Sequence, residues 1–308
     1  MFIFHVSDIE GALYPLQHVI NFVNREARDG DLVVVSGDMI TGIDSGKLNK
    51  SLEELCKERD RITAEEFNAA VKAEIEDSYG KLKEILEKSK IPVLSVPGNH
   101  DYALYEEIVK FEKHHPIHAR MVEIGGVKIA GLGGADIAVS DPRYNITELN
   151  LMVNDPLMDK KSVKVSSAYD TLASLSGTPV ILVTHMPPYG VKDFVNQDVS
   201  HVGSHGIRDY IDEHDVRLVL CGHIQESQGI EALSQGKTVV VNAGTLSNSA
   251  FHKRLPRTLT VVEYDGGFKL GIVYQFTDLK NGTLDVLTTY RHNGANLLVE
   301  NKSNSKFT

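Results

Sequence analysis

Short apolar segments rich in Val, Ile and Leu recur along the chain, and longer polar stretches separate most of them. Each has four to six residues, the length expected of a strand buried on both faces of a sheet. Because stretches of helical character lie between most of these segments, the pattern predicts an α/β fold in which helices cover a sheet. The segments span residues 2–6, 32–35, 93–96, 127–132, 180–183, 218–221 and 238–241.

Three later apolar segments, at 258–264, 270–276 and 284–290, have no helical stretch between them. Turn-forming residues separate them, at 265–267 in the first gap and at 281–282 in the second. This arrangement predicts antiparallel strands.

We expect residues 1–290 to form a single domain with a helical insert at about 48–90, followed by a polar, frayed C-terminal tail at 291–308. In the second helix of the insert, apolar side chains recur every three or four residues, so one face should pack on the core. These side chains are Phe67, Val71, Ile75, Tyr79, Leu82 and Leu86.

Composition and charge narrow the class of protein. The net charge of the 308 residues is -10, which argues against a protein that coats nucleic acid or binds membrane surfaces. No apolar stretch approaches the roughly 20 residues of a membrane-spanning helix. The first predicted strand begins at Phe2 and leaves no room for a signal peptide, and Cys56 and Cys221 imply no disulfide framework. We therefore expect a cytoplasmic enzyme, and nothing in the sequence directly supports an oligomer.

Five polar segments follow predicted strands, four of them directly. They carry carboxylate, amide and imidazole groups at the place where α/β enzymes collect their functional residues. They are Ser7-Asp8-Ile9-Glu10-Gly11, Ser36-Gly37-Asp38, Pro97-Gly98-Asn99-His100-Asp101, Val183-Thr184-His185 and Cys221-Gly222-His223-Ile224-Gln225.

In order and residue type, these segments resemble the motifs of the calcineurin-like metallophosphoesterases over roughly residues 1–265. The segments around His185, His201 and His223 look closest to the branch called Icc-related phosphoesterases. The resemblance implies an α/β fold built as a four-layer α/β/β/α sandwich: two mixed sheets face each other, helices flank them, and a metal site lies at their common edge. It also implies a metal-dependent hydrolase of a small phosphoric diester or monoester, in which two divalent cations activate a hydroxide and neutralise the phosphate oxygens.

The resemblance also assigns roles to individual residues. Asp38 would bridge two cations. Asp8, Glu10 and Gln225 would complete the first metal site, and Asn99, His185 and His223 the second. His100 would stabilise the transition state or protonate the leaving group, and Asp101 would orient His100 as the second catalytic residue.

Two positions depart from the family pattern, because Glu10 and Gln225 stand where the family has histidines. They make the first site entirely oxygen-donor, which suits Mg²⁺ or Mn²⁺ better than Zn²⁺. We expect Mn²⁺ as the cofactor, with Mg²⁺, Fe²⁺, Zn²⁺ and Ni²⁺ as alternatives. Two other interpretations stay open: Glu10 interacts with a helix N-terminus, or Gln225 only hydrogen-bonds a ligand.

Further polar residues lie near these motifs. His201, His205 and Arg208 are candidates for substrate binding; alternatively, Ser204 caps a helix and both histidines are incidental. Residues 242–245 should shape the floor of the site through a tight turn. The histidines near Pro116 are expected in a loop or helix cap.

Other members of the superfamily fit less well. Gly37-Asp38 lacks the following Asp-Arg pair of protein serine/threonine phosphatases, and the chain lacks the basic stripe of a nuclease. The remaining alternative is a catalytically silent relative that binds a phosphorylated ligand or a partner protein. Its support is the pair of departures at Glu10 and Gln225.

Overall fold

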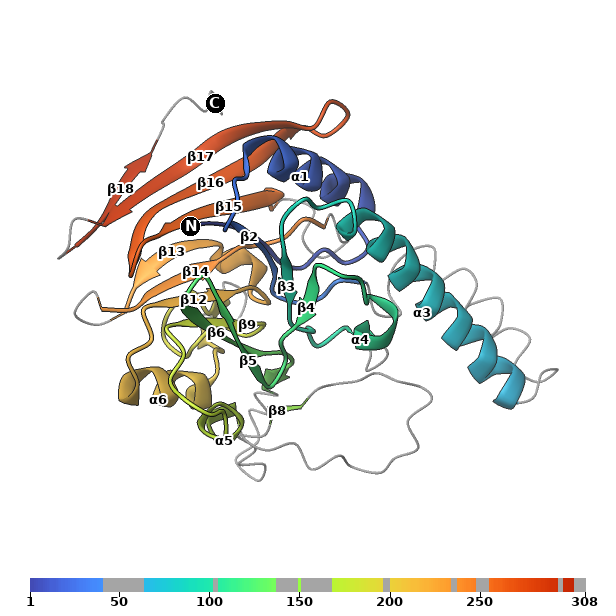
Figure 1. Cartoon of the computed structure of the whole chain (residues 1–308), viewed down its shortest axis with the longest axis horizontal. Helices are drawn as coiled ribbons and strands as arrows, with labels where there is room; N and C mark the ends of the chain where they lie inside the picture. The colour runs from blue at the N-terminus through green and yellow to red at the C-terminus, as the bar shows by residue number, and fades with distance from the viewer. Residues whose placement is uncertain are drawn as a thin grey trace.

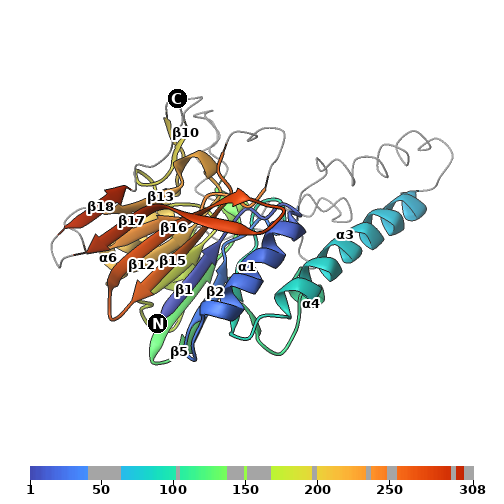
Figure 2. The same ribbon diagram turned by 90° about the horizontal axis from the view of Figure 1, so that it is seen from above.

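Two large sheets face each other and helices cover their outer faces, as Figures 1 and 2 show. The computed structural model describes residues 1–40, 64–101, 105–136, 149–150, 168–195, 200–233, 237–247, 255–292 and 296–301. Among these residues no helix is long and apolar enough to cross a membrane.

The larger sheet has eight strands in the order β18-β17-β16-β15-β1-β2-β3-β4. Its half from β1 to β4 is parallel, and its half from β15 to β18 is antiparallel. The strands are β1 (Phe2–Val6), β2 (Leu32–Val35), β3 (Val93–Ser95), β4 (His114–Pro116), β15 (Thr258–Tyr264), β16 (Phe268–Asp278), β17 (Thr283–His292) and β18 (Leu297–Asn301).

The smaller sheet has six strands in the order β13-β14-β12-β9-β6-β5, with the four central strands parallel and both edge strands antiparallel. They are β5 (Arg120–Ile124), β6 (Val127–Leu132), β9 (Ile181–Thr184), β12 (Leu218–Cys221), β13 (Gly229–Ala232) and β14 (Val239–Asn242). Two short pairs complete the strands: β7 (Ala135–Asp136) with β8 (Leu149–Asn150), and β10 (Phe194–Val195) with β11 (Ser200–His201).

The described helices lie on the outer faces or at the strand ends. They are α1 (Leu13–Glu26), α3 (Ala64–Leu86), α4 (Tyr105–Ile108), α5 (Ala168–Ala173), α6 (His205–Glu213) and the 3₁₀ helix η1 (Gln225–Ser227). Figure 2 shows α1 and α3 along the outer face of the larger sheet.

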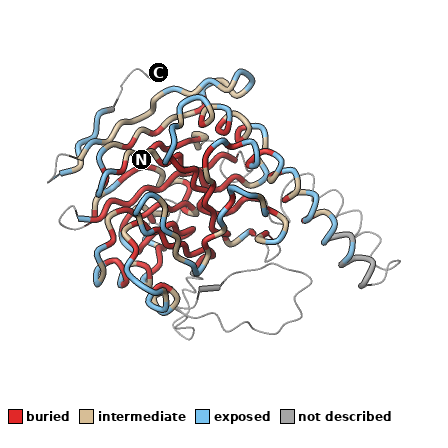
Figure 3. Tube along the Cα trace, viewed as in Figure 1, coloured by how far each residue is buried: buried red, intermediate tan, exposed pale blue. Residues whose placement is uncertain are grey.

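Alternation along the central strands divides the core into three apolar layers. Figure 3 shows the buried residues, in red, concentrated along the strands of the two sheets. Val33 and Val35 of β2 pack toward α1 and α3, whereas Val34 faces the other sheet. On β12, Leu220 faces the first sheet and Val219 packs toward α5 and α6. Because side chains of a strand alternate between faces, each sheet is buried on both sides, as its uninterrupted apolar sequence predicted. The four-layer α/β/β/α sandwich is confirmed.

The expected core stripe of the helical insert is confirmed where it is described, since Ile75, Tyr79, Leu82 and Leu86 are buried. The side chains of Phe67 and Val71, the first part of the insert and Cys56 lie outside the described residues.

Two expectations are corrected. The segment after residue 291 is not all tail, because β17 extends to His292 and the apolar triplet at 297–299 forms β18 on its edge. The histidines near Pro116 are not in a helix cap: His114 and His115 lie on an edge strand, because His114–Pro116 pairs with β3, and His118 forms an isolated bridge with Gly131.

Candidate metal centre

The predicted ligands follow strands of both sheets and gather where those strands end. Asp8 follows β1 and Asp38 follows β2, while His185 follows β9 and His223 follows β12. Two hydrogen bonds join the sheets at this edge: the His223 backbone N–H donates to Asp8 Oδ2 (2.9 Å), and His185 Nδ1 donates to the Ser36 carbonyl (2.7 Å).

Four of the ligand candidates adopt the left-handed backbone conformation that non-glycine residues rarely take. The φ angles are 47° at Asp8, 43° at Glu10, 49° at Asp38 and 64° at His223. Each such residue costs about 1–2 kcal/mol, so the surrounding structure must compensate. Part of the compensation is visible, because the N–H groups of Asp8 and Glu10 bond the carbonyls of Gly37 (3.0 Å) and Asp38 (2.8 Å).

Two glycines allow the ligand loops to approach closely. A Cβ on Gly98 would overlap the carboxylate and backbone of Asp38. A Cβ on Gly222 would overlap the Ser7 hydroxyl and the Asp8 carboxylate. The glycine of each motif is therefore required by the close approach of a neighbouring ligand loop.

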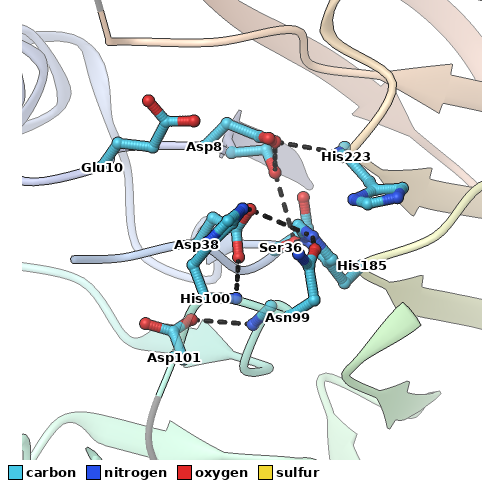
Figure 4. Close-up of polar contacts among 12 residues, drawn as sticks. Asp8, Glu10, Ser36, Asp38, Asn99, His100, Asp101, His185 and His223 are labelled. Carbon is cyan, nitrogen blue, oxygen red and sulfur yellow. Dashed lines mark hydrogen bonds and ion pairs between the residues drawn. The ribbon is translucent and has the colours of Figure 1, made fainter. Parts of the chain in front are cut away.

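Two groups of potential ligands form, and Asp38 belongs to both. Donor atoms of Asp8, Glu10 and Asp38 lie within 4.8 Å of one another, as do those of Asp38, His185 and His223. Figure 4 shows Asp38 between the two groups, with Asn99 beside His185.

Asn99 Oδ1 lies 3.0 Å from His185 Nε2, which places the amide with the second group. The structure thus brings together the seven candidates proposed from sequence: Asp8, Glu10, Asp38, Asn99, His185, His223 and Gln225.

Gln225 lies against the first group through its amide nitrogen. Its Nε2 donates to Asp8 Oδ1 (3.0 Å) and to Glu10 Oε1 (2.8 Å). The other amide atom, Oε1 of Gln225, is buried without a hydrogen-bond partner among the described residues, and so is Oε2 of Glu10. Unsatisfied buried oxygens are rare in folded proteins, and here they lie in a cluster of carboxylates whose oxygens suit divalent cations. The donor set therefore fits two metal ions.

Glu10 lies outside helix α1, which begins at Leu13 and has no acidic residue in its first turn. The Glu10 carboxylate accepts the Gln225 amide.

His185 is buried and His223 is partly buried, and their surroundings act on them differently. Burial alone would lower the pKa of His185, yet the adjacent Asp38 carboxylate, 3.4 Å away, raises that pKa to about 9. Desolvation, together with the nearby His185, lowers the pKa of His223 to about 3. His223 is therefore neutral, as a metal-binding imidazole must be.

The two buried aspartates also differ. Burial is the main cause that raises the pKa of Asp8 to about 7. Burial acts in the same direction on Asp38, but His185 reverses it and holds the pKa of Asp38 below its usual range. Several carboxylates in one dry site repel each other, and a bound cation removes that repulsion.

Asp101 joins two loops of the site. Its carboxylate accepts hydrogen bonds from the backbone N–H groups of Gly98 (2.7 Å) and Met39 (3.0 Å) and from the Tyr79 hydroxyl (3.0 Å). Because a buried carboxylate bonds the nearest N–H groups, Asp101 fixes the 98–101 loop to the one that carries Asp38. That Asp101 also orients His100 stays a prediction.

His100 reaches the site through its backbone. Its N–H donates to Asp38 Oδ1 (2.8 Å), and its side chain is 47% exposed with Nε2 4.0 Å from Asp38 Oδ2. The imidazole is thus open to solvent beside the shared carboxylate.

The proposed substrate-binding histidines belong to an imidazole cluster formed by Tyr189, Asp193, Phe194, His201 and His205. Buried Asp193 accepts bonds from His201 Nδ1 (2.5 Å) and from the backbone of Gly190 and Gly203. The half-exposed Tyr189 ring stacks on His205 with the ring centres 3.9 Å apart.

The cluster lies beside the metal centre, since the Phe194 N–H bonds Ser227 of η1, which begins at Gln225. Arg208 bonds the Asp212 carboxylate (2.8 Å) and the backbone carbonyl of Tyr189 in the cluster (3.2 Å). Ser204 caps α6 as expected, accepting the Ile207 N–H.

The floor of the site is the turn after β14. The Asn242 amide bonds the carbonyls of Gly222 (3.3 Å) and Ile224 (2.9 Å), and the Thr245 hydroxyl bonds the Asp8 carbonyl (3.0 Å). The predicted tight turn is present, because the Gly244 N–H donates to Asn242 Oδ1.

The sequence did not single out three supporting residues. Ser7 donates to Asp8 Oδ2 (2.6 Å), and Tyr79 and Asp193 hold the loops described above. Ser7 belongs to the first motif, so its position next to Asp8 could have indicated a supporting role. Tyr79 had only the signature of a core residue, and nothing around Asp193 marked it as a partner of His201.

Comparisons with known proteins identify the family. The family model described as metallophosphoesterase, calcineurin superfamily, matches residues 2–253. No curated protein matches the chain.

Several solved structures are similar in fold. The TT1561 protein of Thermus thermophilus is 16% identical, with 92% of this chain and 97% of that one covered and a TM-score of 0.50. A structure described as a novel archaeal phosphodiesterase is 14% identical (89% and 99% covered, TM-score 0.42). GAP50 of Plasmodium is 12% identical (98% and 90% covered, TM-score 0.48). At these identities the likeness concerns the fold alone.

Proposed function

The chain belongs to the calcineurin superfamily of metallophosphoesterases, and from that membership we propose that it hydrolyses a small phosphoric ester with two divalent cations. The observation that carries the proposal is the position of Asp38, which contributes to both ligand groups. A carboxylate shared in this way holds two cations close together, the arrangement that two-metal phosphoester hydrolases use.

The first cation would be held by Asp8, Glu10, Asp38 and Gln225, and the second by Asp38, Asn99, His185 and His223. When bound, the pair supplies an activated water and neutralises charge on the phosphate oxygens. Mn²⁺ is our first choice, because it accepts both the all-oxygen set and the set with two imidazoles; Mg²⁺, Fe²⁺, Zn²⁺ and Ni²⁺ are the alternatives.

His100 would contact the substrate. Its backbone bond to Asp38 fixes its position, and its exposed imidazole can donate to a phosphate or leaving-group oxygen. Asp101 contributes indirectly, by holding the 98–101 loop.

The imidazole cluster would bind the alcohol portion of the ester. Its support is the Asp193–His201 bond, which occupies Nδ1, so Nε2 is the nitrogen of this half-exposed ring that would contact the substrate. Arg208 would support the Tyr189 loop through the carbonyl it bonds.

The alternative function is a silent relative that binds a phosphorylated ligand or partner protein. The observation that favours it is the Gln225 amide, which bridges Asp8 and Glu10 where the first cation would bind. Metal content after refilling with Mn²⁺ separates the two functions: two equivalents per chain support the enzyme, and one or none supports the silent relative.

The proposal is tested with metal-stripped protein refilled with Mn²⁺, Mg²⁺, Zn²⁺ or Ni²⁺. Bis-p-nitrophenyl phosphate and p-nitrophenyl phosphate are the substrates, and their relative rates separate a diesterase from a monoesterase. Turnover that depends on Mn²⁺ supports the proposal. Folded protein that hydrolyses neither ester with any of the metals would overturn it.

A further inference from the structure

The two ligand groups differ in the side chain that contacts their oxygens. In the second group an imidazole makes these contacts: His185 Nε2 lies 3.0 Å from Asn99 Oδ1 and 3.4 Å from Asp38 Oδ2, and the His223 ring stands next to it with the two ring centres 4.9 Å apart. In the first group the Gln225 amide nitrogen lies 3.0 Å from Asp8 Oδ1 and 2.8 Å from Glu10 Oε1. Asp8 and Glu10 both belong to the group that would hold the first cation.

We propose that the Gln225 side-chain amide is an internal stand-in for the first cation, so that this position admits a metal only after the amide rotates. The proposal rests on the two metal positions of the proposed function. It adds the order in which the two positions fill and the metals that each prefers. Its evidence is the geometry of the Gln225 amide and two oxygens without hydrogen-bond partners among the described residues, one in that amide and one in the Glu10 carboxylate.

A half-turn of the amide exchanges its nitrogen and oxygen. In the present orientation the partial positive charge of the NH₂ group faces both carboxylates, while Gln225 Oε1 and Glu10 Oε2 are buried without partners. After rotation Oε1 would face Asp8 and Glu10, where three oxygens repel one another unless a cation lies among them. The two orientations therefore correspond to the metal-free and metal-filled first position.

The backbone around Gln225 holds the rest of the side chain in place during this exchange. Gln225 is 5% exposed and begins η1, and the Ile224 carbonyl before it accepts the Asn242 amide. Only the terminal amide is free to turn, since a terminal torsion of this kind is broad and roughly two-fold.

Selectivity follows from the same contacts. A cation in the first position must displace two hydrogen bonds to carboxylates and gains only oxygen ligands in return. Zn²⁺ gains least from such ligands, whereas Mn²⁺ and Mg²⁺ prefer them. The chain should therefore bind one Zn²⁺ tightly at the position with imidazoles, and bind two Mn²⁺ with unequal affinities.

Calorimetric titration of metal-free protein with Zn²⁺ or Mn²⁺ alone tests the stoichiometry. We expect one tight Zn²⁺ per chain and two Mn²⁺, the second about 10-fold or more weaker than the first. In Gln225→His the amide is replaced by an imidazole, and tight Zn²⁺ should rise from one equivalent to two. Gln17→His, on α1, is the matched control and should still bind one equivalent of tight Zn²⁺. Two equal Zn²⁺ sites in the unsubstituted protein, or a Gln225→His variant that still binds one, would overturn the proposal.

A second readout follows the amide directly. In ¹H–¹⁵N spectra the NH₂ pair of Gln225, identified by its absence in Gln225→His, should stay unchanged during the first equivalent of Zn²⁺. It should shift only when excess Mg²⁺ fills the first position. A shift complete at the first equivalent of Zn²⁺ would contradict the proposal.

These experiments contain no ester. Protein that binds metals as expected and hydrolyses nothing would overturn the proposed function alone. Protein that hydrolyses esters and binds two Zn²⁺ with equal affinity would overturn the inference alone.

Discussion

The backbone N–H of His100 donates to the Asp38 carboxylate over 2.8 Å, so the loop that follows β3 is tied to the residue that follows β2. Gly98 makes this approach possible, since any larger residue there would collide with Asp38. The position of His100, the imidazole proposed to contact the substrate, and the position of Asp38, the proposed shared ligand, are thereby set by the same contact.

Gly98→Ala should therefore damage the metal centre. The added methyl group overlaps the Asp38 carboxylate, and we expect metal affinity to fall by about 10–100-fold, as when groups that support metal ligands are disturbed. Gly80→Ala is the control, because a Cβ there meets open space within α3. It should raise the free energy of unfolding by about 0.5–1 kcal/mol and leave metal binding unchanged. Equal metal affinity in both variants would contradict the role of Gly98.

Asp101→Asn should act through the loop and not through His100. Removing the charge weakens the bonds from Gly98 and Met39, and we expect the free energy of unfolding to fall by about 1–3 kcal/mol. Tyr79→Phe removes one of the bonds and should cost about 1 kcal/mol. Urea unfolding measures both.

A double-mutant cycle of turnover distinguishes the two roles of Asp101. If Asp101 only fixes the loop, Asp101→Asn lowers turnover by a similar factor in the unsubstituted enzyme and in His100→Ala. If Asp101→Asn lowers turnover in the unsubstituted enzyme but not in His100→Ala, the result would support the role predicted from sequence, in which Asp101 orients His100.

Much of the fold follows from sequence because the central strands are buried on both faces. Val33, Val34 and Val35 all point into apolar layers, and no polar residue interrupts them. The four strands at the edges of the two large sheets, β4, β5, β13 and β18, were not predicted. An edge strand is only partly buried, as in β5, where Arg120 and Glu123 are exposed, so its sequence lacks the uninterrupted apolar signal.

The candidate ligands could also be chosen from sequence, since each lies in a segment that follows a strand whose end lies at the common edge. The orientation of side chains could not be predicted in this way. Nothing in Gly98-Asn99-His100-Asp101 indicates that the carboxylate turns back to Gly98 and Met39, because those contacts depend on a neighbouring loop. The pairing of Asp193 with His201 likewise depends on the β10–β11 hairpin.

His201→Asn tests the imidazole cluster. If His201 contacts the alcohol portion of the ester, KM for bis-p-nitrophenyl phosphate should rise about 10-fold while kcat changes less, the pattern of lost binding. His115→Asn, an exposed histidine on β4, is the control and should change neither constant. Loss of kcat with constant KM would contradict a binding role.

His114 should make the protein less stable in mild acid. Burial lowers the pKa of His114 to about 4 from 6.5, and its ring nitrogens contact Ser95 and the Val109 carbonyl. Between these values the unfolded chain binds the extra proton and the folded chain does not, so stability is lost as pH falls below 6.5. This residue alone should remove about 2 kcal/mol between pH 7.5 and pH 5.

His114→Gln keeps a hydrogen-bonding side chain and removes the titration. Urea unfolding at the two pH values should show a smaller decrease in stability for this variant than for the unsubstituted protein. Equal decreases would mean that His114 is not the group responsible.

The central claim is that Asp38 serves two cations at once, and Asp38→Asn tests it most directly. Metal content and hydrolysis of bis-p-nitrophenyl phosphate would be measured together after refilling with Mn²⁺, beside the exposed control Asp29→Asn. We predict two Mn²⁺ per chain and full turnover for the control. For Asp38→Asn we predict fewer than two Mn²⁺ and a loss of turnover of about 10³-fold or more, equivalent to several kcal/mol of transition-state stabilisation. Folded Asp38→Asn that keeps both metals and comparable turnover would contradict the account.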